Sequence, residues 1–261
     1  MRSDLHQETA IELGLLGIFV IFAIAETLFP RPERQRVPSG EARLFTNFGL
    51  TIFVLVAGGL FPLARMTSSI ASERFGLGLT HAVHLPWAAI LFASLILDSF
   101  ASYWVHRLMH VTPVFWRLHR VHHSDDAVDL STSLRNHPLE LLVTVPPSML
   151  VVLVLGAAPS VILATQTIFM TVTFWEHADL HLPEWLDRPL SAVLVTPAVH
   201  RIHHGKERQL HDRNFGNFLT LWDQLFGTLE RCGISHDVGL DGQRARSDHL
   251  LEQIYSPFYR V

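Results

Sequence analysis

Long apolar runs alternate with polar, histidine-rich stretches along the chain. The first run, Ile11 to Phe29, has nineteen residues and only two charges, Glu12 and Glu26, which stand near its ends. As a helix rising 1.5 Å per residue, it would extend about 28 Å, close to the hydrocarbon thickness of a bilayer. The pattern therefore predicts a transmembrane helix.

A cleaved secretory signal peptide is the alternative reading of this first run. The tripeptide "AIA" at positions 23–25 resembles the small-residue cleavage site of such peptides. The preceding segment, however, carries Asp4, Glu8 and Glu12, where a signal peptide has a positively charged leader. We therefore expect the segment to remain as a membrane helix.

Four further apolar runs predict the rest of the bundle. Leu44–Leu63 and Trp87–Val105 are long enough to cross a bilayer, and the second of them contains one acid, Asp98. Leu139–Leu155 and Val161–Trp175 are shorter and predict either a hairpin that enters and returns or two tight spans. They are interrupted by Pro146, Pro147, Gly156 and Pro159. The expected fold is all-α, an integral membrane bundle of about four transmembrane helices.

Arginine residues indicate the orientation of this bundle. The loop after the first span is rich in arginine, whereas the segment between the second and third spans holds little positive charge beyond Arg65 and Arg74. Because arginine-rich loops stay in the cytoplasm, crossings counted from there bring the segments after His106 and Glu176 to the cytoplasmic side. The histidine-rich segments are thus expected to form a cytoplasmic helical cap. The loop arginines are Arg31, Arg34, Arg36 and Arg43.

Composition supports a membrane protein with one domain. Of 261 residues, 49% are hydrophobic and 17% are charged, which is not the balance of an ordinary soluble domain. No linker, low-complexity tract or internal repeat divides the chain, so residues 1–261 are expected to form a single domain. The net charge of -4 without an evident basic face argues against nucleic acid as a partner. The single cysteine, Cys232, excludes an internal disulfide and is expected to be a small buried residue.

Histidines form boxes with helical spacing: "HRLMH", "HRVHH" and "HRIHH", with a further pair in "HADLH". Residues three or four apart lie on one side of a helix, so each box can direct its imidazoles at a common centre. With 17 histidines in 261 residues, chance gives roughly 0.07 HxxHH triples, and the chain has two. The boxes therefore indicate metal ligands. They contain His106, His110, His119, His122, His123, His177, His181, His200, His203 and His204.

Other histidines stand alone in the sequence, and we expect them at the surface or at an interface. They are His6, His81, His84, His211, His236 and His249.

The number of ligands bears on the kind of metal. Ten histidines offer five nitrogens to each of two ions, whereas a zinc site is complete with four ligands. Imidazole also suits iron, copper and nickel. Since activation of O₂ needs a redox metal and lipid C–H bonds lie close by, a redox dimetal centre is favoured. A haem held by His106 and His119 would leave eight histidines unexplained, and a His-rich metal transport or storage protein without redox catalysis is the second hypothesis.

Acidic residues near the boxes are candidates for orienting the rings. Metal-bound imidazoles commonly donate their second N–H to a carboxylate. For Asp98, pairing with a polar group of a neighbouring helix is an equal alternative. The candidates are Asp98, Asp125, Asp126, Asp129, Glu140, Glu176, Asp179 and Asp223.

These residues resemble the sterol desaturase / fatty acid hydroxylase superfamily of integral-membrane, non-haem di-iron oxygenases. The resemblance covers residues 98–228 and rests on "DSFASYWVHRLMH", "FWRLHRVHHSD", "TSLRNHPLE", "VHRIHHG" and "NFGNFLTLWDQLFGT", in that order. The three residues between the histidines of the first box match sterol-type members, whereas some fatty acid hydroxylases have four.

The resemblance implies two iron ions bound by the ten boxed histidines, with His177 and His181 completing the set. It places Arg135 and His137 beside the site with Glu140. It also implies O₂ as co-substrate and a sterol-like or fatty-acyl lipid as substrate, hydroxylated or desaturated. The fused haem-binding electron-donor domain of some members has no counterpart in this sequence, so electrons are expected from a separate carrier protein.

The surroundings of the boxes suggest two further roles. Aromatic residues near the boxes could line a lipid path or anchor the chain at the membrane interface. Arginines inside the boxes could dock an acidic electron carrier or contact lipid phosphates. The aromatic residues are Phe100, Tyr103, Trp104, Phe115, Trp116, Phe174 and Trp175, and the arginines are Arg107, Arg117, Arg120 and Arg201.

Overall fold

The computed structural model describes residues 2–32, 40–58, 61–231, 237–240 and 247–259. Within these ranges the chain is helical, and its only β contacts are isolated bridges. Cys232, His236, Arg34 and Arg36 lie outside the described residues, and the side chain of His6 is not described. The long helices are α1 (Arg2–Leu28), α2 (Gly40–Gly58), α3 (Phe61–Phe75), α5 (Trp87–Val111), α7 (Leu141–Leu155) and α8 (Pro159–His177).

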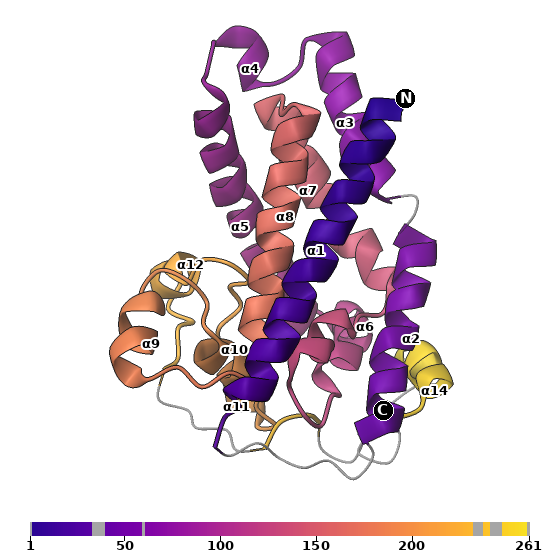
Figure 1. Cartoon of the computed structure of the whole chain (residues 1–261), viewed down its shortest axis with the longest axis vertical. Helices are drawn as coiled ribbons and strands as arrows, with labels where there is room; N and C mark the ends of the chain where they lie inside the picture. Colours follow the sequence, from indigo (N-terminus) through magenta and orange to yellow (C-terminus); the bar gives the residue numbers. More distant parts are fainter. Residues whose placement is uncertain (1, 33–39, 59–60, 232–236, 241–246, 260–261) are drawn as a thin grey trace.

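Short helices gather at one end of the long bundle (Figure 1). They are α6 (Pro113–His123), η1 (Leu130–Leu134), η2 (Pro138–Glu140), α9 (Glu184–Leu190), α10 (Pro197–His203), α11 (Arg208–His211), α12 (Leu221–Leu225), α14 (Leu250–Tyr255) and η3 (Ser256–Phe258). The opposite end carries α4 (Leu79–Ala82) beside the end of α3. Since α5 and α8 both run toward the end with the short helices, their last turns bring His106, His110 and His177 there.

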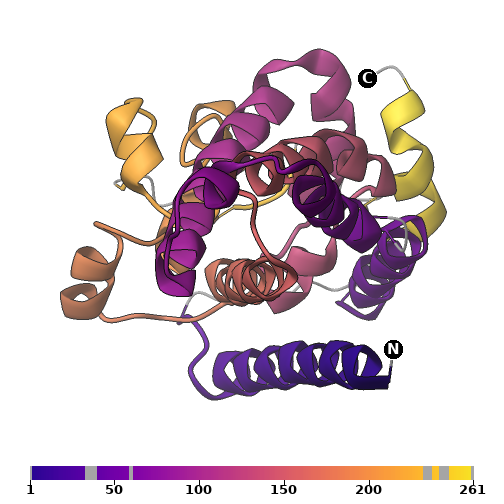
Figure 2. The same ribbon diagram turned by 90° about the horizontal axis from the view of Figure 1, so that it is seen from above.

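The bundle is held together by α7, which packs against both α3 and α5, and by α8, which packs against α5 and α1. In the view of Figure 2, α1 lies along one edge of the bundle next to α8. A core of small and branched apolar residues, among them Val152 and Val161, fills the space between α7, α8 and α5. This core lies at the turn between α7 and α8, so the other ends of these helices are free to carry polar residues.

Within the described ranges, two helices are long and apolar enough to cross a membrane, Trp87–Val111 and Pro138–Leu155. In α1 the described side chains begin at Leu13, and the apolar stretch Leu13–Leu28 lies within the first predicted span. The predicted second span, Leu44–Leu63, overlaps α2, which is described as far as Gly58, and the first residues of α3, which is described from Phe61. Residues 59–60 lie outside the described part of the chain.

The prolines predicted to interrupt the fourth run lie inside α7, which continues from Leu141 to Leu155. Gly156 does end this helix, as expected, because its positive φ of 72° is a left-handed conformation that glycine adopts without strain. Pro159 then starts α8 in its first turn, where no N–H is needed. A short turn thus joins the two helices, each of which packs against other helices of the bundle.

The outer faces of the long helices expose large apolar side chains. Leu16 and Ile21 on α1, Val56 on α2, Phe92 on α5 and Leu150 on α7 are each more than 58% exposed. Scattered exposed leucines are common in soluble proteins, but apolar faces along several neighbouring helices indicate a non-aqueous environment. The exposed faces are therefore suited to contact lipid.

Candidate metal centre

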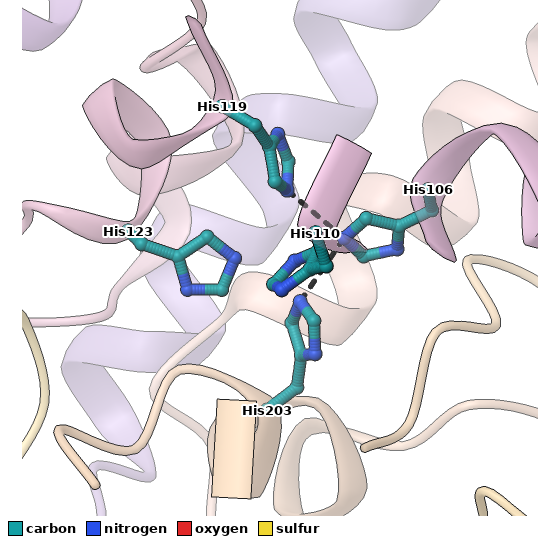
Figure 3. A group of neighbouring side chains, drawn as sticks. All are labelled: His106, His110, His119, His123 and His203. Carbon is teal, nitrogen blue, oxygen red and sulfur yellow. Dashed lines mark hydrogen bonds between the residues drawn. The ribbon is translucent and has the colours of Figure 1, made fainter. Parts of the chain in front are cut away.

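Nine of the ten boxed histidines form two buried groups. In each group the candidate ligand atoms all lie within 4.8 Å of one another. Figure 3 shows the first group, whose rings come from separate helices and converge on one point. The first group is His106, His110, His119, His123 and His203, and the second group is His122, His177, His200 and His204.

Helical geometry explains how the two HxxHH boxes divide between the groups. In a helix, the residue four positions on lies about 40° from the first around the axis, and the residue three positions on lies about 60° from the first in the opposite rotational direction, so the two flank it on one face. In α6, His119 and His123 accordingly join the first group, and His122 joins the second. The box that begins in α10 divides the other way. His203 joins the first group, and His200 and His204 join the second.

In the first group, ring nitrogens face one another without a proton to share. Nδ1 of His106 lies 2.9 Å from the carbonyl oxygen of Phe215, and Nδ1 of His203 lies 2.6 Å from that of Arg213. A carbonyl oxygen can only accept, so each Nδ1 carries the hydrogen and each neutral ring leaves a lone pair on Nε2. Yet the two Nε2 atoms are 3.0 Å apart, and Nε2 of His119 is also 3.0 Å from that of His106 (Figure 3).

The second group repeats this arrangement. Nδ1 of His177 donates to the carbonyl oxygen of Thr173 at 2.8 Å, and Nδ1 of His122 donates to that of Arg135 at 3.1 Å. Their Nε2 atoms are 3.1 Å apart, and Nε2 of His200 lies 3.0 Å from that of His177. Four converging imidazole nitrogens of this kind form a metal-ligand set.

Converging lone pairs repel each other unless a cation lies between them. Protonation cannot supply that cation easily, because burial, reinforced by neighbouring imidazoles, lowers the pKa of His123, His200 and His204 well below the ordinary histidine value. A metal ion satisfies all the lone pairs at once and needs the rings in this neutral state. The residues therefore fit two metal ions, one in each group.

One carboxylate holds a ring of the first group directly. Oε2 of Glu140 lies 3.0 Å from Nδ1 of His119, and the other oxygen of Glu140 accepts the backbone N–H of His137. Asp212, which the sequence analysis did not select, has a carboxylate oxygen 3.5 Å from Nδ1 of His110. Most of the remaining partners of the rings are backbone carbonyls, so the expectation that carboxylates orient the rings is met chiefly by Glu140.

The loop after α11 supplies two of those carbonyls. Asp223, a predicted orienting acid, accepts hydrogen bonds at 2.8 Å from the backbone N–H groups of Phe215 and Gly216. A Cβ atom at Gly216 would lie 2.8 Å from Oδ2 of Asp223, so this approach requires glycine. Asn214 has a positive φ of 54° and bridges the backbone at Val199 and Glu230. Asp223 thus acts on His106 indirectly, by fixing the carbonyl of Phe215.

A buried ionic network supports the second group from the side of α2. Arg43 pairs with both Asp125 and Asp129. Burial raises the pKa of Asp125, but the charges of Arg43 and Arg135 outweigh burial and leave the pKa below its ordinary value. Arg135 is fully buried and donates to the carbonyl oxygen of Val121. Because its own carbonyl accepts from His122, this network fixes that ring.

The other predicted orienting residues contact different partners. Asp98 forms a 2.7 Å ion pair with Arg65 of α3, which corresponds to the alternative of pairing with a polar group on a neighbouring helix. Nε2 of His137 lies 3.1 Å from the carbonyl oxygen of Ile254, while Asp179 lies 3.7 Å from Arg201. Asp126 accepts from Ser247, and the carboxylate of Glu176 is 3.8 Å from Nδ1 of its neighbour His177.

Two histidines lie elsewhere than the sequence predicts. His181 is exposed and outside both groups. Since α8 ends at His177 and Ala178 leaves the helical conformation, His177 and His181 are not one helical turn apart. His211, expected at the surface, is buried and stacks on Trp116 at 5.3 Å. Its ring centroid is 6.1 Å from that of His110. The isolated His81, His84 and His249 are exposed, as expected.

Two cavities meet the first group from different directions. A cavity of about 200 Å³ between α3, α5, α7 and α8 reaches His106, and Val105, Phe169 and Met170 line it. A pocket of about 500 Å³ reaches His110 from the other side and is lined by Trp116 and His211 among others. The first group is therefore accessible both from within the bundle and from its end.

An apolar groove of about 450 Å³ lies beside the inner cavity, between α5 and α7. Phe100 and Trp104 line this groove. Ala101, Val105 and Pro147 line both spaces and form the wall between them.

Comparisons with known proteins agree with this geometry. A family model described as fatty acid hydroxylase matches residues 91–228, which include all ten boxed histidines. Alkylglycerol monooxygenase of Homo sapiens is 30% identical over 189 residues, which cover 67% of this chain and 40% of that protein. Ornithine lipid hydroxylase OlsE of Rhizobium tropici is 28% identical over 272 residues, covering 99% of this chain and 78% of that protein.

A very-long-chain aldehyde decarbonylase of Arabidopsis thaliana is 27% identical over 194 residues, covering 68% of this chain and 29% of that protein. The match to this chain covers less than half of the length of alkylglycerol monooxygenase as well. No solved structure matches it. From the matched region and the relatives, the chain belongs to the fatty acid hydroxylase family, within the sterol desaturase / fatty acid hydroxylase superfamily.

Proposed function

We propose that the protein is a membrane-bound di-iron oxygenase that hydroxylates or desaturates a lipid C–H bond. The observation that carries the proposal is the convergence of unprotonated imidazole nitrogens in two adjacent buried groups of five and four. The first group would hold one iron and the second group the other. Iron is favoured over zinc because the relatives are named as a monooxygenase and a hydroxylase, and such chemistry needs a redox metal.

Bound iron would supply the activation of O₂ and the electrons for its reduction. In hydroxylation, one oxygen atom enters the C–H bond and the other leaves as water, with two electrons and two protons supplied from outside. In desaturation, two hydrogens leave the lipid, and these together with two electrons and two protons supplied from outside convert both oxygen atoms to water. Both outcomes begin with removal of one hydrogen from the same bound lipid.

The residues of this chain would bind and position that lipid. Val105, Met109 and Phe169 give the inner cavity apolar surface, and the cavity reaches His106. An alkyl segment held there would reach the first group in a space from which the packed helices exclude bulk water. The outer groove gives a route from the bilayer, because only Ala101, Val105 and Pro147 separate it from the cavity. Phe100 and Trp104 would line this route, as the sequence suggests.

The protein would be an integral membrane protein of about four spans with both histidine groups at the cytoplasmic end. The exposed apolar faces of the long helices and the two helices of sufficient length support membrane insertion. The arginine-rich loop after α1 supports the orientation. Arg43 is buried in ion pairs, so the orientation depends on Arg31, Arg34 and Arg36.

Electrons would come from a separate carrier protein that docks at the pocket beside His110. Arg117 and Arg208 line this pocket and are exposed, which suits an acidic partner. Arg120 and Arg201 are buried and donate to the backbone carbonyls of Ser256 and Val128. They would therefore support the fold, and the docking role would fall to Arg117 and its exposed neighbours.

The substrate would be a polar membrane lipid. Among the relatives, one is named for an alkylglycerol and another for an ornithine lipid, both of which join an apolar chain to a polar group. The test compares the lipids of cells that express the wild-type chain with those of cells that express His203→Ala. A hydroxylated or unsaturated lipid should appear only with the wild type, and identical lipid profiles at equal expression would contradict the proposal.

A further inference from the structure

The inner cavity has a polar group at the end remote from the histidines. Arg65 of α3 and Asp98 of α5 both line it, together with the amide of Gln166. Asp98 lies eight residues before His106 on the same helix, which separates the two by about 12 Å along the helix axis. Between them on α5 the lining includes Ala101, Ser102 and Val105, so a mostly apolar stretch separates two polar ends.

The ion pair between Arg65 and Asp98 leaves hydrogen-bonding capacity unused. Nη2 of Arg65 donates to Oδ2 of Asp98 at 2.7 Å. Within the described part of the chain, Nε of Arg65 and Oδ1 of Asp98 are buried and have no hydrogen-bond partner. Asp98 is only 6% exposed, and an unsatisfied charged group at such depth is costly. One free donor and one free acceptor therefore belong to an ion pair whose two residues both line the cavity.

We propose that Arg65 and Asp98 recognise a neutral polar group on the lipid, one that both donates and accepts hydrogen bonds, about 12 Å from the carbon that reacts. An amide meets this requirement, because its N–H can donate to Oδ1 of Asp98 and its carbonyl can accept from Nε of Arg65. A hydroxyl meets it in the same way. The inference rests on the proposed function, because it assigns the inner cavity to the lipid substrate.

This recognition would select among lipids by the position of a polar group. A site built around hydrogen-bonding groups strongly rejects an analogue that lacks the partner, because its own buried groups then stay unsatisfied. A purely apolar chain in the cavity would leave Nε of Arg65 and Oδ1 of Asp98 in that state. A chain with an amide at the matching position would satisfy both. The pair would thus act as a specificity determinant, without contact to the reacting carbon.

The alternative is that the pair only joins α3 to α5. Replacing both residues together keeps this alternative testable, because exchange of a buried ion pair for apolar residues of similar volume is often neutral for stability, whereas a single change strands a charge. The variant is therefore the double substitution Arg65→Met with Asp98→Leu. Thr67→Leu, at an exposed position of α3, is the matched control.

The experiment measures binding of radiolabelled decanamide and decane to the protein as purified, in detergent micelles and without oxygen, so that no turnover occurs. Recognition predicts that the double variant loses about tenfold or more in affinity for decanamide, while its affinity for decane is unchanged or higher. Thr67→Leu should bind both compounds like the wild type.

Equal changes in affinity for the two compounds, or no change in affinity for decanamide, would overturn the recognition role. The ion pair would then only join α3 to α5. Because the assay involves no oxidation, its result is independent of whether the protein is an oxygenase. Selective binding of decanamide by a chain that oxidises no lipid would count against the proposed function alone.

Discussion

The two histidine groups differ in what surrounds them. The first group meets two open spaces, since His106 lines the cavity within the bundle and His110 lines the pocket at its end. No member of the second group lines any of the cavities described above. The first group also has a carboxylate partner in Glu140. The difference indicates that the first metal position would meet substrate and electrons, and that the enclosed second position would assist it.

Removing one ligand from each group gives the largest expected effect. His203→Ala and His200→Ala should each reduce product formation more than about a hundredfold. This reduction is larger than the loss expected for a residue that only hydrogen-bonds to a ligand. Iron content should separate them, because four ring nitrogens would remain in the first group and three in the second. We expect His200→Ala to lose iron more readily on dialysis against a chelator. Equal retention of iron by both variants would contradict the difference between the groups.

Acidification should remove both metals. Burial lowers the pKa of His122 and His203 well below the ordinary histidine value, so the folded rings stay neutral where an unfolded chain is already protonated. Stability and metal binding are therefore retained above about pH 6.5. Both decline below it, because the unfolded chain takes up protons first. Iron measured after dialysis across this range should be lost by about pH 5. Full retention at lower pH would argue against histidine ligation.

Blocking the inner cavity should act on the lipid and leave the metals in place. Val105→Trp puts a large ring into the wall shared by the cavity and the outer groove, so turnover should fall at least about tenfold by steric exclusion of the substrate. Iron content should match the wild type. Phe92→Trp, at an exposed position of the same helix, is the control. Unchanged turnover in Val105→Trp would mean that the lipid reaches the first group by another route.

Glu140→Gln tests the carboxylate that lies 3.0 Å from Nδ1 of His119. The amide keeps the acceptor for Nδ1 of His119 but loses the negative charge, so metal affinity at the first group should fall about tenfold. The second group, whose ring partners are carbonyls of Thr173 and Arg135, should be unaffected. Competition with a chelator measures both affinities. If both metals weaken equally, Glu140 supports the fold of the whole centre instead of one ring.

The smallest effect is expected for His181→Ala. Its ring is exposed and outside both groups, so iron content and turnover should equal those of the wild type. The matched variant His177→Ala, four residues earlier and in the second group, should lose iron. Loss of iron from His181→Ala would restore the tenth ligand that the histidine boxes predict.

Sequence spacing predicts the centre wherever a helix continues through the box. His119, His122 and His123 lie in one helix, so their spacing alone places them around two neighbouring points. The prediction of His181 as a ligand stays unsupported because α8 ends just before it, and helix ends are set by tertiary contacts that periodicity does not report. The burial of His211 was not predicted, because its partners, Trp116 and His110, are far from it in sequence.

The long helices show the same limit. The apolar runs locate α5, α7 and α8, yet they do not report how a proline is accommodated. The two prolines of α7 were expected to interrupt a run, and they lie inside the helix. Backbone carbonyl partners such as Phe215 could not be predicted, because a carbonyl carries no side-chain signature. The expectation of a single domain stays a prediction.

Metal content tests the central claim most directly. Protein purified without oxygen and loaded with ferrous iron should hold two irons per chain, one for each histidine group, and should consume O₂ when reduced. The His200→Ala and His203→Ala variants give the reference for each position. A single exchangeable zinc or nickel per chain, with no O₂ consumption on reduction, would contradict the oxygenase and indicate a metal-binding or transport protein.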